Sequence, residues 1–160
     1  MTQAYSEVEL VDIAKQIERC GEAFYEQAIK HSKNPKIKAL FEFLLKEEGE
    51  HAKAFEEMLA SVRYAGEWRT DPNYQAYLRT VVETRVFPTP EAARKLVDDL
   101  GNEIDAIRFA ISFEKDTVLF FHDLRRMVRE EDVPVIERLI AEEQNHLRVL
   151  GEMLHELRAS

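Results

Sequence analysis

The chain has 160 residues, enough for one domain with a sizeable core, and 45% of them are hydrophobic and 33% charged. Its formal net charge of −9 argues against nucleic acid as a partner, because phosphate binding needs a cationic surface. No apolar run approaches the ~20 residues of a membrane span, and the acidic N-terminus lacks the features of a secretory signal. We therefore expect a cytoplasmic protein with no membrane partner. The single cysteine, Cys20, excludes an intramolecular disulfide, a cysteine-based zinc site and an iron–sulfur cluster.

Helical spacing of apolar residues recurs along nearly the whole chain, and the first two helices are expected to form a hairpin. A capping box predicts that the first helix begins at Ser6, and it continues to about His31. Asn34 and Pro35 then supply the N-cap and first residue of a second helix that reaches about Arg63. Because only a few residues join them, the two helices must be antiparallel neighbours.

A long connection, about residues 64–101, follows this hairpin. Apolar and aromatic residues between Tyr74 and Val82 fall at helical spacing, which predicts one short extra helix. Thr89-Pro90 opens a further helical stretch that is interrupted near Gly101.

The second half of the chain repeats the hairpin. A third helix is expected over about 103–128 and a fourth over about 133–157, with a short acidic turn between them. The crossover is long enough to return along a helix of ~39 Å, and a hairpin alone cannot bury its apolar face. We therefore predict an all-α four-helix bundle of the class with one long crossover, which includes the ferritin-like folds. Hairpins at about 6–63 and 102–158 would form one domain spanning 1–160.

Both hairpins carry the same acidic motif, a lone glutamate followed about 30 residues later by Glu-x-x-His. Equivalent glutamates are 96 residues (18 to 114) and 95 residues (48 to 143) apart. The motif residues are Glu18, Glu48 and His51 in the first hairpin, and Glu114, Glu143 and His146 in the second. Antiparallel pairing puts the glutamates of one hairpin at similar heights. The i, i+3 spacing puts the Glu and His of each pair on one helix face.

All four glutamates lie on mainly apolar helix stripes. The neighbours of Glu48, for example, are Phe41, Leu44, Ala52 and Phe55. Burying four carboxylates without a cationic partner would be very costly, and no Lys or Arg on these stripes is placed to neutralise them. Metal ions would neutralise the carboxylates. Six oxygen and imidazole ligands suit a pair of ions, for which we expect iron, with manganese or zinc as alternatives.

Three other features have weaker claims to the site. Glu152-x-x-His155 repeats the Glu-x-x-His spacing but faces the opposite side of its helix, so we expect it to be exposed to solvent. Glu22, one turn from Glu18, is expected at the rim of the site, although a role as an extra ligand stays open. Tyr25 is either an ordinary core residue or a hydrogen-bond donor to a metal-bound carboxylate.

The stretch Ile17–Tyr25 and the doubled Glu-x-x-His resemble the rubrerythrin-type branch of the ferritin-like superfamily, over nearly the whole chain. This resemblance implies a di-iron centre in which Glu18 and Glu114 are terminal ligands and the glutamates of the two Glu-x-x-His pairs bridge. It also implies reduction of hydrogen peroxide or dioxygen. Rubrerythrins carry an additional carboxylate where this chain has Thr117, and often a cysteine-ligated rubredoxin domain, which a single cysteine cannot build.

Three functions are compatible with such a site. A redox enzyme would let a reduced di-metal centre react with peroxide or dioxygen, with electrons from an unidentified donor. An iron-handling protein would bind and oxidise ferrous iron for delivery or storage. A non-catalytic module would use its metals only to hold the bundle together. We favour the oxidoreductase, and we expect a homodimer because the aromatic crossover, which includes Trp68, offers apolar surface.

Overall fold

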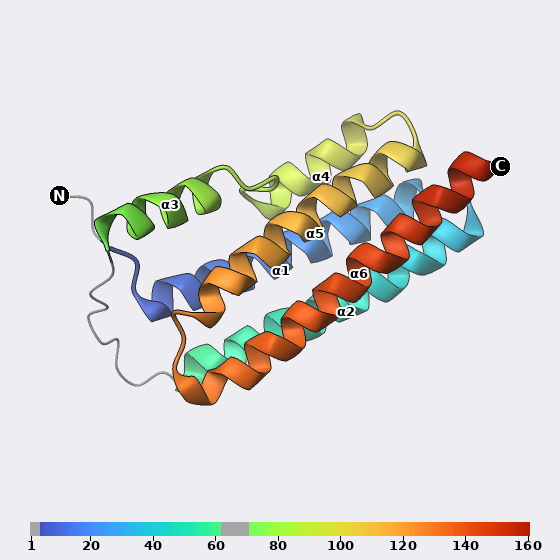
Figure 1. The fold of residues 1–160 in the computed structure, drawn as a ribbon. Helices are drawn as coiled ribbons and strands as arrows, with labels where there is room; N and C mark the ends of the chain where they lie inside the picture. The colour runs from blue at the N-terminus through green and yellow to red at the C-terminus, as the bar shows by residue number, and fades with distance from the viewer. Residues whose placement is uncertain (1–3, 62–70) are drawn as a thin grey trace.

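Two antiparallel helical hairpins form the bundle in a computed structural model (Figure 1), which describes residues 4–61 and 71–160. In the first hairpin, α1 (Glu7–His31) packs against α2 (Pro35–Ser61). In the second, α5 (Glu103–Arg125) packs against α6 (Val133–Ala159). The short 3-10 helix η1 (Glu130–Asp132) forms the predicted acidic turn. The predicted all-α four-helix bundle is confirmed.

The crossover between the hairpins lies along one side of the bundle (Figure 1) and contains α3 (Pro72–Glu83) and α4 (Pro90–Asp99). These helices match the short helix and the further helical stretch expected there. Arg63, the expected end of the second helix, and Trp68 lie outside the described residues. None of the helices in the described ranges has the length and apolar character that a membrane crossing requires. The assignment of one domain to 1–160 stays a prediction.

Side-chain caps determine where the helices begin. Ser6 accepts a hydrogen bond from the backbone N–H of Glu9 (3.2 Å), and its own backbone N–H donates to the Glu9 carboxylate (2.8 Å), which confirms the capping box. The side chains of Thr89 and Asn102 cap α4 and α5. The Asn34 side chain accepts a hydrogen bond from the first turn of α2. These polar residues satisfy backbone N–H groups that have no partner inside their helices.

The helix α5 ends earlier than predicted, at Arg125 rather than near Val128. The backbone N–H groups of Met127 and Val128 both donate to the Leu124 carbonyl, at 2.8 and 3.1 Å, so the chain tightens into a final turn. Both side chains are buried. Their burial against the core redirects the chain before it enters η1.

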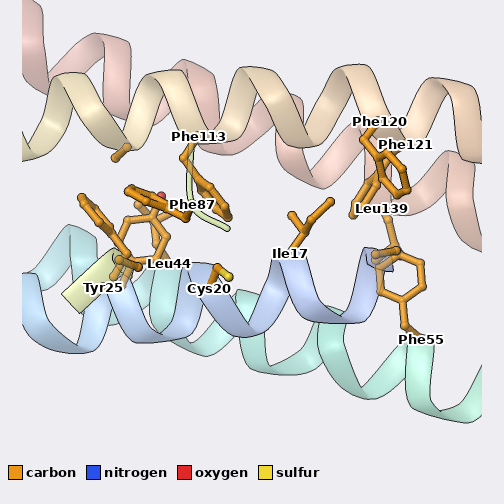
Figure 2. Close-up of a cluster of buried hydrophobic side chains, with 14 of the residues drawn as sticks. Ile17, Cys20, Tyr25, Leu44, Phe55, Phe87, Phe113, Phe120, Phe121 and Leu139 are labelled. Atoms are coloured by element: carbon orange, nitrogen blue, oxygen red, sulfur yellow. The ribbon is translucent and has the colours of Figure 1, made fainter. Parts of the chain in front are cut away.

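The largest fully buried side chains of the described residues are mostly aromatic. In Figure 2 they gather in two groups along the bundle, with Ile17 and Cys20 between them. Phe87, which comes from the crossover, stacks on Phe24 with ring centres 5.3 Å apart and contacts Phe113 at 5.2 Å. The crossover therefore closes the bundle as well as connecting its halves. Cys20 is buried, and this burial raises the pKa of its thiol to about 11.

Two tyrosines attach α3 to α5. The rings of Tyr74 and Tyr77 stack with centres 5.8 Å apart, and both hydroxyls donate to the Asp123 carboxylate, at 2.9 and 2.8 Å. The Arg126 guanidinium lies 5.1 Å from the centre of the Tyr74 ring. Burial is the main reason that the pKa of Tyr74 rises to about 12. These tyrosines pack the crossover, and the expected homodimer stays a prediction.

We predict that Ser6→Ala lowers the free energy of unfolding of the metal-free protein by about 1 kcal/mol, because the first turn of α1 loses its side-chain acceptor. Urea denaturation at neutral pH measures this difference. Ser112→Ala is the control, since Ser112 is an exposed residue inside α5 whose hydroxyl donates only to the helix backbone. Equal losses in the two variants would contradict the prediction.

Candidate metal centre

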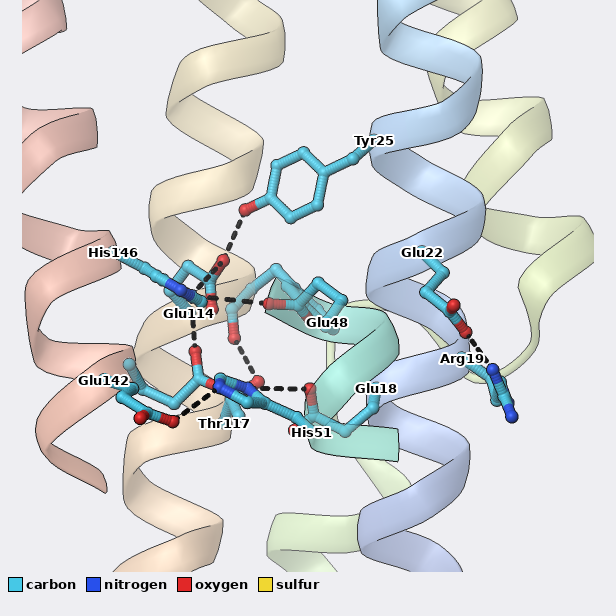
Figure 3. A network of polar contacts seen from close by, with 12 residues as sticks. Glu18, Arg19, Glu22, Tyr25, Glu48, His51, Glu114, Thr117, Glu142 and His146 are labelled. Carbon is cyan, nitrogen blue, oxygen red and sulfur yellow. Dashed lines mark hydrogen bonds and ion pairs between the residues drawn. The ribbon is translucent and has the colours of Figure 1, made fainter. Parts of the chain in front are cut away.

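The six motif residues meet between the long helices, and none of their side chains is more than 2% exposed. Figure 3 labels five of them, all except Glu143. All four long helices contribute to this cluster. Two overlapping groups bring their potential ligand atoms within 4.8 Å of one another. They are Glu18, Glu48, His51 and Glu143 in one group, and Glu48, Glu114, Glu143 and His146 in the other. Glu48 and Glu143 belong to both groups, so each lies between the two halves of the cluster.

The two histidines direct Nδ1 towards the glutamates. His51 Nδ1 lies 2.6 Å from Glu143 Oε1 and 3.4 Å from Glu18 Oε2. His146 Nδ1 lies 2.9 Å from Glu143 Oε2 and 3.4 Å from Glu48 Oε1. The imidazole rings stack with centres 5.5 Å apart and an angle of 15° between their planes. The cluster is thus organised around two parallel imidazoles that share one carboxylate.

Most polar atoms of this cluster lack a hydrogen-bond partner. Seven of the eight oxygens of the four glutamates are buried without one, although four of these seven lie 2.6–3.4 Å from an imidazole nitrogen. Within residues 4–61 and 71–160, no Lys or Arg forms an ion pair with these carboxylates. Buried carboxylates normally have partners, since leaving them unpaired costs several kcal/mol or more. Metal ions would satisfy these lone pairs, so the residues present fit a metal centre.

Burial and mutual repulsion perturb the carboxyl groups. Burial raises the pKa values of Glu18, Glu48 and Glu114 well above the ordinary value of 4.5, and repulsion from neighbouring carboxylates adds to the effect. Burial alone would also raise the pKa of Glu143, but its contacts with the two histidines together outweigh burial and lower this pKa to about 2. Without metal, burial therefore favours the protonated forms of the Glu18, Glu48 and Glu114 carboxyl groups.

Both histidines also retain protons more strongly than usual. Burial lowers their pKa values, but the surrounding carboxylates more than compensate. Glu143 is the main opposing group for His51, whereas His146 is opposed by Glu114, Glu143 and Glu48. Metal ions would therefore displace protons from both kinds of ligand.

Tyr25 is hydrogen-bonded to the cluster rather than only packed in the core. Its hydroxyl donates to Glu114 Oε1 (Figure 3), the one glutamate oxygen of the four that has such a donor. Burial, followed by the charge of Glu114, raises the pKa of Tyr25 well above 10.0, so the phenol stays protonated. Thr117 is also buried, but its hydroxyl donates to the Phe113 carbonyl (3.1 Å). This position therefore supplies no additional carboxylate.

The two weaker candidates lie away from the cluster. The Glu22 carboxylate pairs with Arg19 (2.6 Å) and points away from the six residues (Figure 3), as expected for a rim residue. Glu152 and His155 are both exposed, and Glu152 pairs with Arg148 (2.6 Å). The Glu-x-x-His spacing alone thus does not identify the site. The two buried motifs lie on apolar helix stripes, whereas the exposed motif does not.

Sequence reasoning missed two residues beside the cluster. A Cβ atom at Gly21 would overlap Glu48 Oε2 and lie 3.0 Å from the Phe113 ring, so the absence of a side chain makes room for the carboxylate. The signal was available, because a glycine inside a helix usually has a packing or functional reason. Glu142 Oε2 lies 3.0 Å from His51 Nε2. The sequence did contain an indication of this residue, because a glutamate directly precedes both buried Glu-x-x-His motifs.

Comparisons with known proteins identify the fold and the family. No curated protein matches the chain. A Thermotoga maritima structure at 2.30 Å resolution, named a ferritin-like diiron-carboxylate protein, superimposes with a TM-score of 0.73. It is 24% identical, and the match covers 98% of this chain and 99% of that one, so it shows a common ferritin-like fold. The rubrerythrin family model matches residues 9–154. Because this match covers most of the chain, the protein belongs to the rubrerythrin family.

Proposed function

We propose that this protein binds two metal ions, with iron as the expected metal, and reduces hydrogen peroxide or dioxygen. The observation that carries the proposal is the set of buried glutamate oxygens without hydrogen-bond partners, facing the Nδ1 atoms of two histidines. Carboxylate and imidazole ligands suit iron, and they also admit manganese or zinc. Membership of the rubrerythrin family supports the oxidoreductase over a purely structural metal site.

The overlapping groups suggest a role for each ligand. Glu48 and Glu143 belong to both groups and would help to hold both ions. Glu18 and His51 would complete the first site. The other two residues, Glu114 and His146, would complete the second. This assignment uses all six motif residues and needs no contribution from Thr117.

The surrounding residues would orient the ligands and exclude water. When bound, ferrous iron supplies electrons for cleavage of an O–O bond, and an unidentified donor would restore them. The Tyr25 hydroxyl, through its hydrogen bond, would hold Glu114 in one orientation. The aromatic side chains in the core limit the entry of water. Small reactants such as peroxide or dioxygen suit so enclosed a centre.

The two Glu-x-x-His pairs of α6 provide a matched test of metal binding. We predict that the wild-type protein binds two ferrous ions per chain, and that His146→Ala loses at least one because a ligand is removed. His155→Ala removes the exposed histidine from the same helix and should retain both ions. Elemental analysis after anaerobic loading and desalting gives the stoichiometry. Two tightly bound ions in His146→Ala would rule out this ligand assignment.

The reaction with peroxide separates an enzyme from a structural metal site. We expect the anaerobic ferrous protein to be oxidised by hydrogen peroxide at least tenfold faster than free ferrous iron at the same concentration. Stopped-flow absorbance measures both rates, and His155→Ala should match the wild type. A protein rate equal to that of free iron, combined with a large loss of thermal stability on chelation, would favour the non-catalytic module instead.

Retained protons give the metal-free protein an unusual pH dependence. Folded Glu18, Glu48 and Glu114 keep protons that the unfolded chain releases near 4.5. The free energy of unfolding should therefore fall as the pH rises from 5 to 8, by about 1.4 kcal/mol per pH unit for each retained proton. The histidines act in the same direction above 6.5, whereas Glu143 is ionised in both states throughout this window.

Urea unfolding of the metal-free protein across this pH range tests the sign. Stability that rises with pH in the metal-free protein would contradict the prediction. Adding zinc at constant pH should release protons, because ligands bind in their deprotonated forms. Titration in weakly buffered solution detects this release directly.

A further inference from the structure

The second nitrogen of His51 has its own partner. While Nδ1 faces the glutamates of the cluster, Nε2 lies 3.0 Å from Glu142 Oε2. Glu142 comes from α6 and His51 from α2, so this contact joins the two hairpins (Figure 3). The Glu142 side chain is 33% exposed and is held from its other side by Arg138 at 3.2 Å. The Glu142 carboxylate thus lies at the outer edge of the cluster, on the side of the His51 ring opposite the cluster glutamates.

The internal repeat places an equivalent glutamate beside the other histidine. Glu47 precedes Glu48 just as Glu142 precedes Glu143. A Glu47 oxygen lies within 4.8 Å of a ring nitrogen of both His51 and His146. The Nε2 atom of His146 is buried and has no hydrogen-bond partner. A carboxylate from the opposite hairpin therefore lies beside the His146 ring, whose Nε2 has no acceptor.

We propose that Glu142 and Glu47 are positioning residues that hold the two histidines from outside, each across the boundary between hairpins. Glu142 serves His51, and Glu47 serves His146. A neutral imidazole has one N–H group, and donating it from Nε2 to a carboxylate leaves the Nδ1 lone pair free for a metal ion. The inference rests on the proposed metal site and deepens it. Neither glutamate touches an ion; each fixes the tautomer and the orientation of a ligand.

Histidine tautomers provide the direct test. Zinc-loaded, ¹⁵N-labelled protein should show both histidines bound through Nδ1 and protonated at Nε2 in long-range ¹H–¹⁵N NMR spectra. The His51 Nε2 proton should exchange with water at least tenfold faster in Glu142→Ala, because its acceptor is lost. Glu142→Gln keeps a side-chain oxygen at the same position and should restore most of the protection. A residue that only stabilises the fold would not produce this rescue.

Metal affinity provides the second readout. We expect Glu142→Ala and Glu47→Ala each to weaken zinc binding 10–100-fold in competition with a chelator. Glu152→Ala is the matched control for Glu142, because it removes a similar i, i+4 ion pair with an arginine from the same helix. Glu50→Ala plays the same part for Glu47, since Glu50 is exposed on α2. Both controls should retain wild-type affinity.

The outcomes separate this inference from the proposed function. A wild-type protein that binds no zinc would overturn both. A wild type that binds two zinc ions, with unchanged affinity and proton exchange in Glu142→Ala and Glu47→Ala, would overturn only the positioning role. Three zinc ions in the wild type and two in Glu47→Ala would also overturn it, because Glu47 would then be a ligand. Thermal melting of each metal-free variant establishes that it is folded.

Discussion

The structure depends on compensating four carboxylates that are buried at one level of a helical bundle. Glu18, Glu48, Glu114 and Glu143 are fully shielded from water, and no described lysine or arginine forms an ion pair with them. Protons can neutralise the first three and the histidines can offset the fourth, but only metal ions satisfy all of their lone pairs together. The buried carboxylates thus call for positive charge that the side chains around them do not fully supply. The protein's aromatic core keeps that charge away from solvent.

The repeated hairpin is the economical way to build such a centre. Each hairpin contributes two glutamates and one histidine, and the resulting groups share Glu48 and Glu143. Packing is most extensive within each hairpin, so the hairpins themselves are well-defined units. The centre lies between them and joins them chemically. Under the proposed function, loss of a ligand on one side would affect both halves, because the metal ions would join the hairpins as well as supply the chemistry.

Much of this could be predicted from the sequence because the signals are local or periodic. The Ser6 capping box, the hairpin geometry and the apolar stripes depend on residues only a few positions apart. The rest depends on which side chains meet in three dimensions. The sequence left open whether Tyr25 only packs in the core or donates a hydrogen bond to a cluster carboxylate. Its partner, Glu114, is known only once α5 is placed beside α1. The contact between His51 and Glu142 crosses from one hairpin to the other, over 91 residues. No spacing rule along one helix can specify such a pair.

Gly21 shows how the centre has limited the sequence around it. Glycine weakens the middle of a helix by roughly 0.5–1 kcal/mol relative to alanine, yet here any side chain would overlap the Glu48 carboxylate. At position 21, helix stability therefore favours alanine, whereas room for the Glu48 carboxylate favours glycine. A variant library screened for heat resistance without metal would drift towards alanine at this position, while one screened for cofactor retention would keep glycine. Natural relatives that have abandoned the centre should be recognisable because the constraint on this residue has been released.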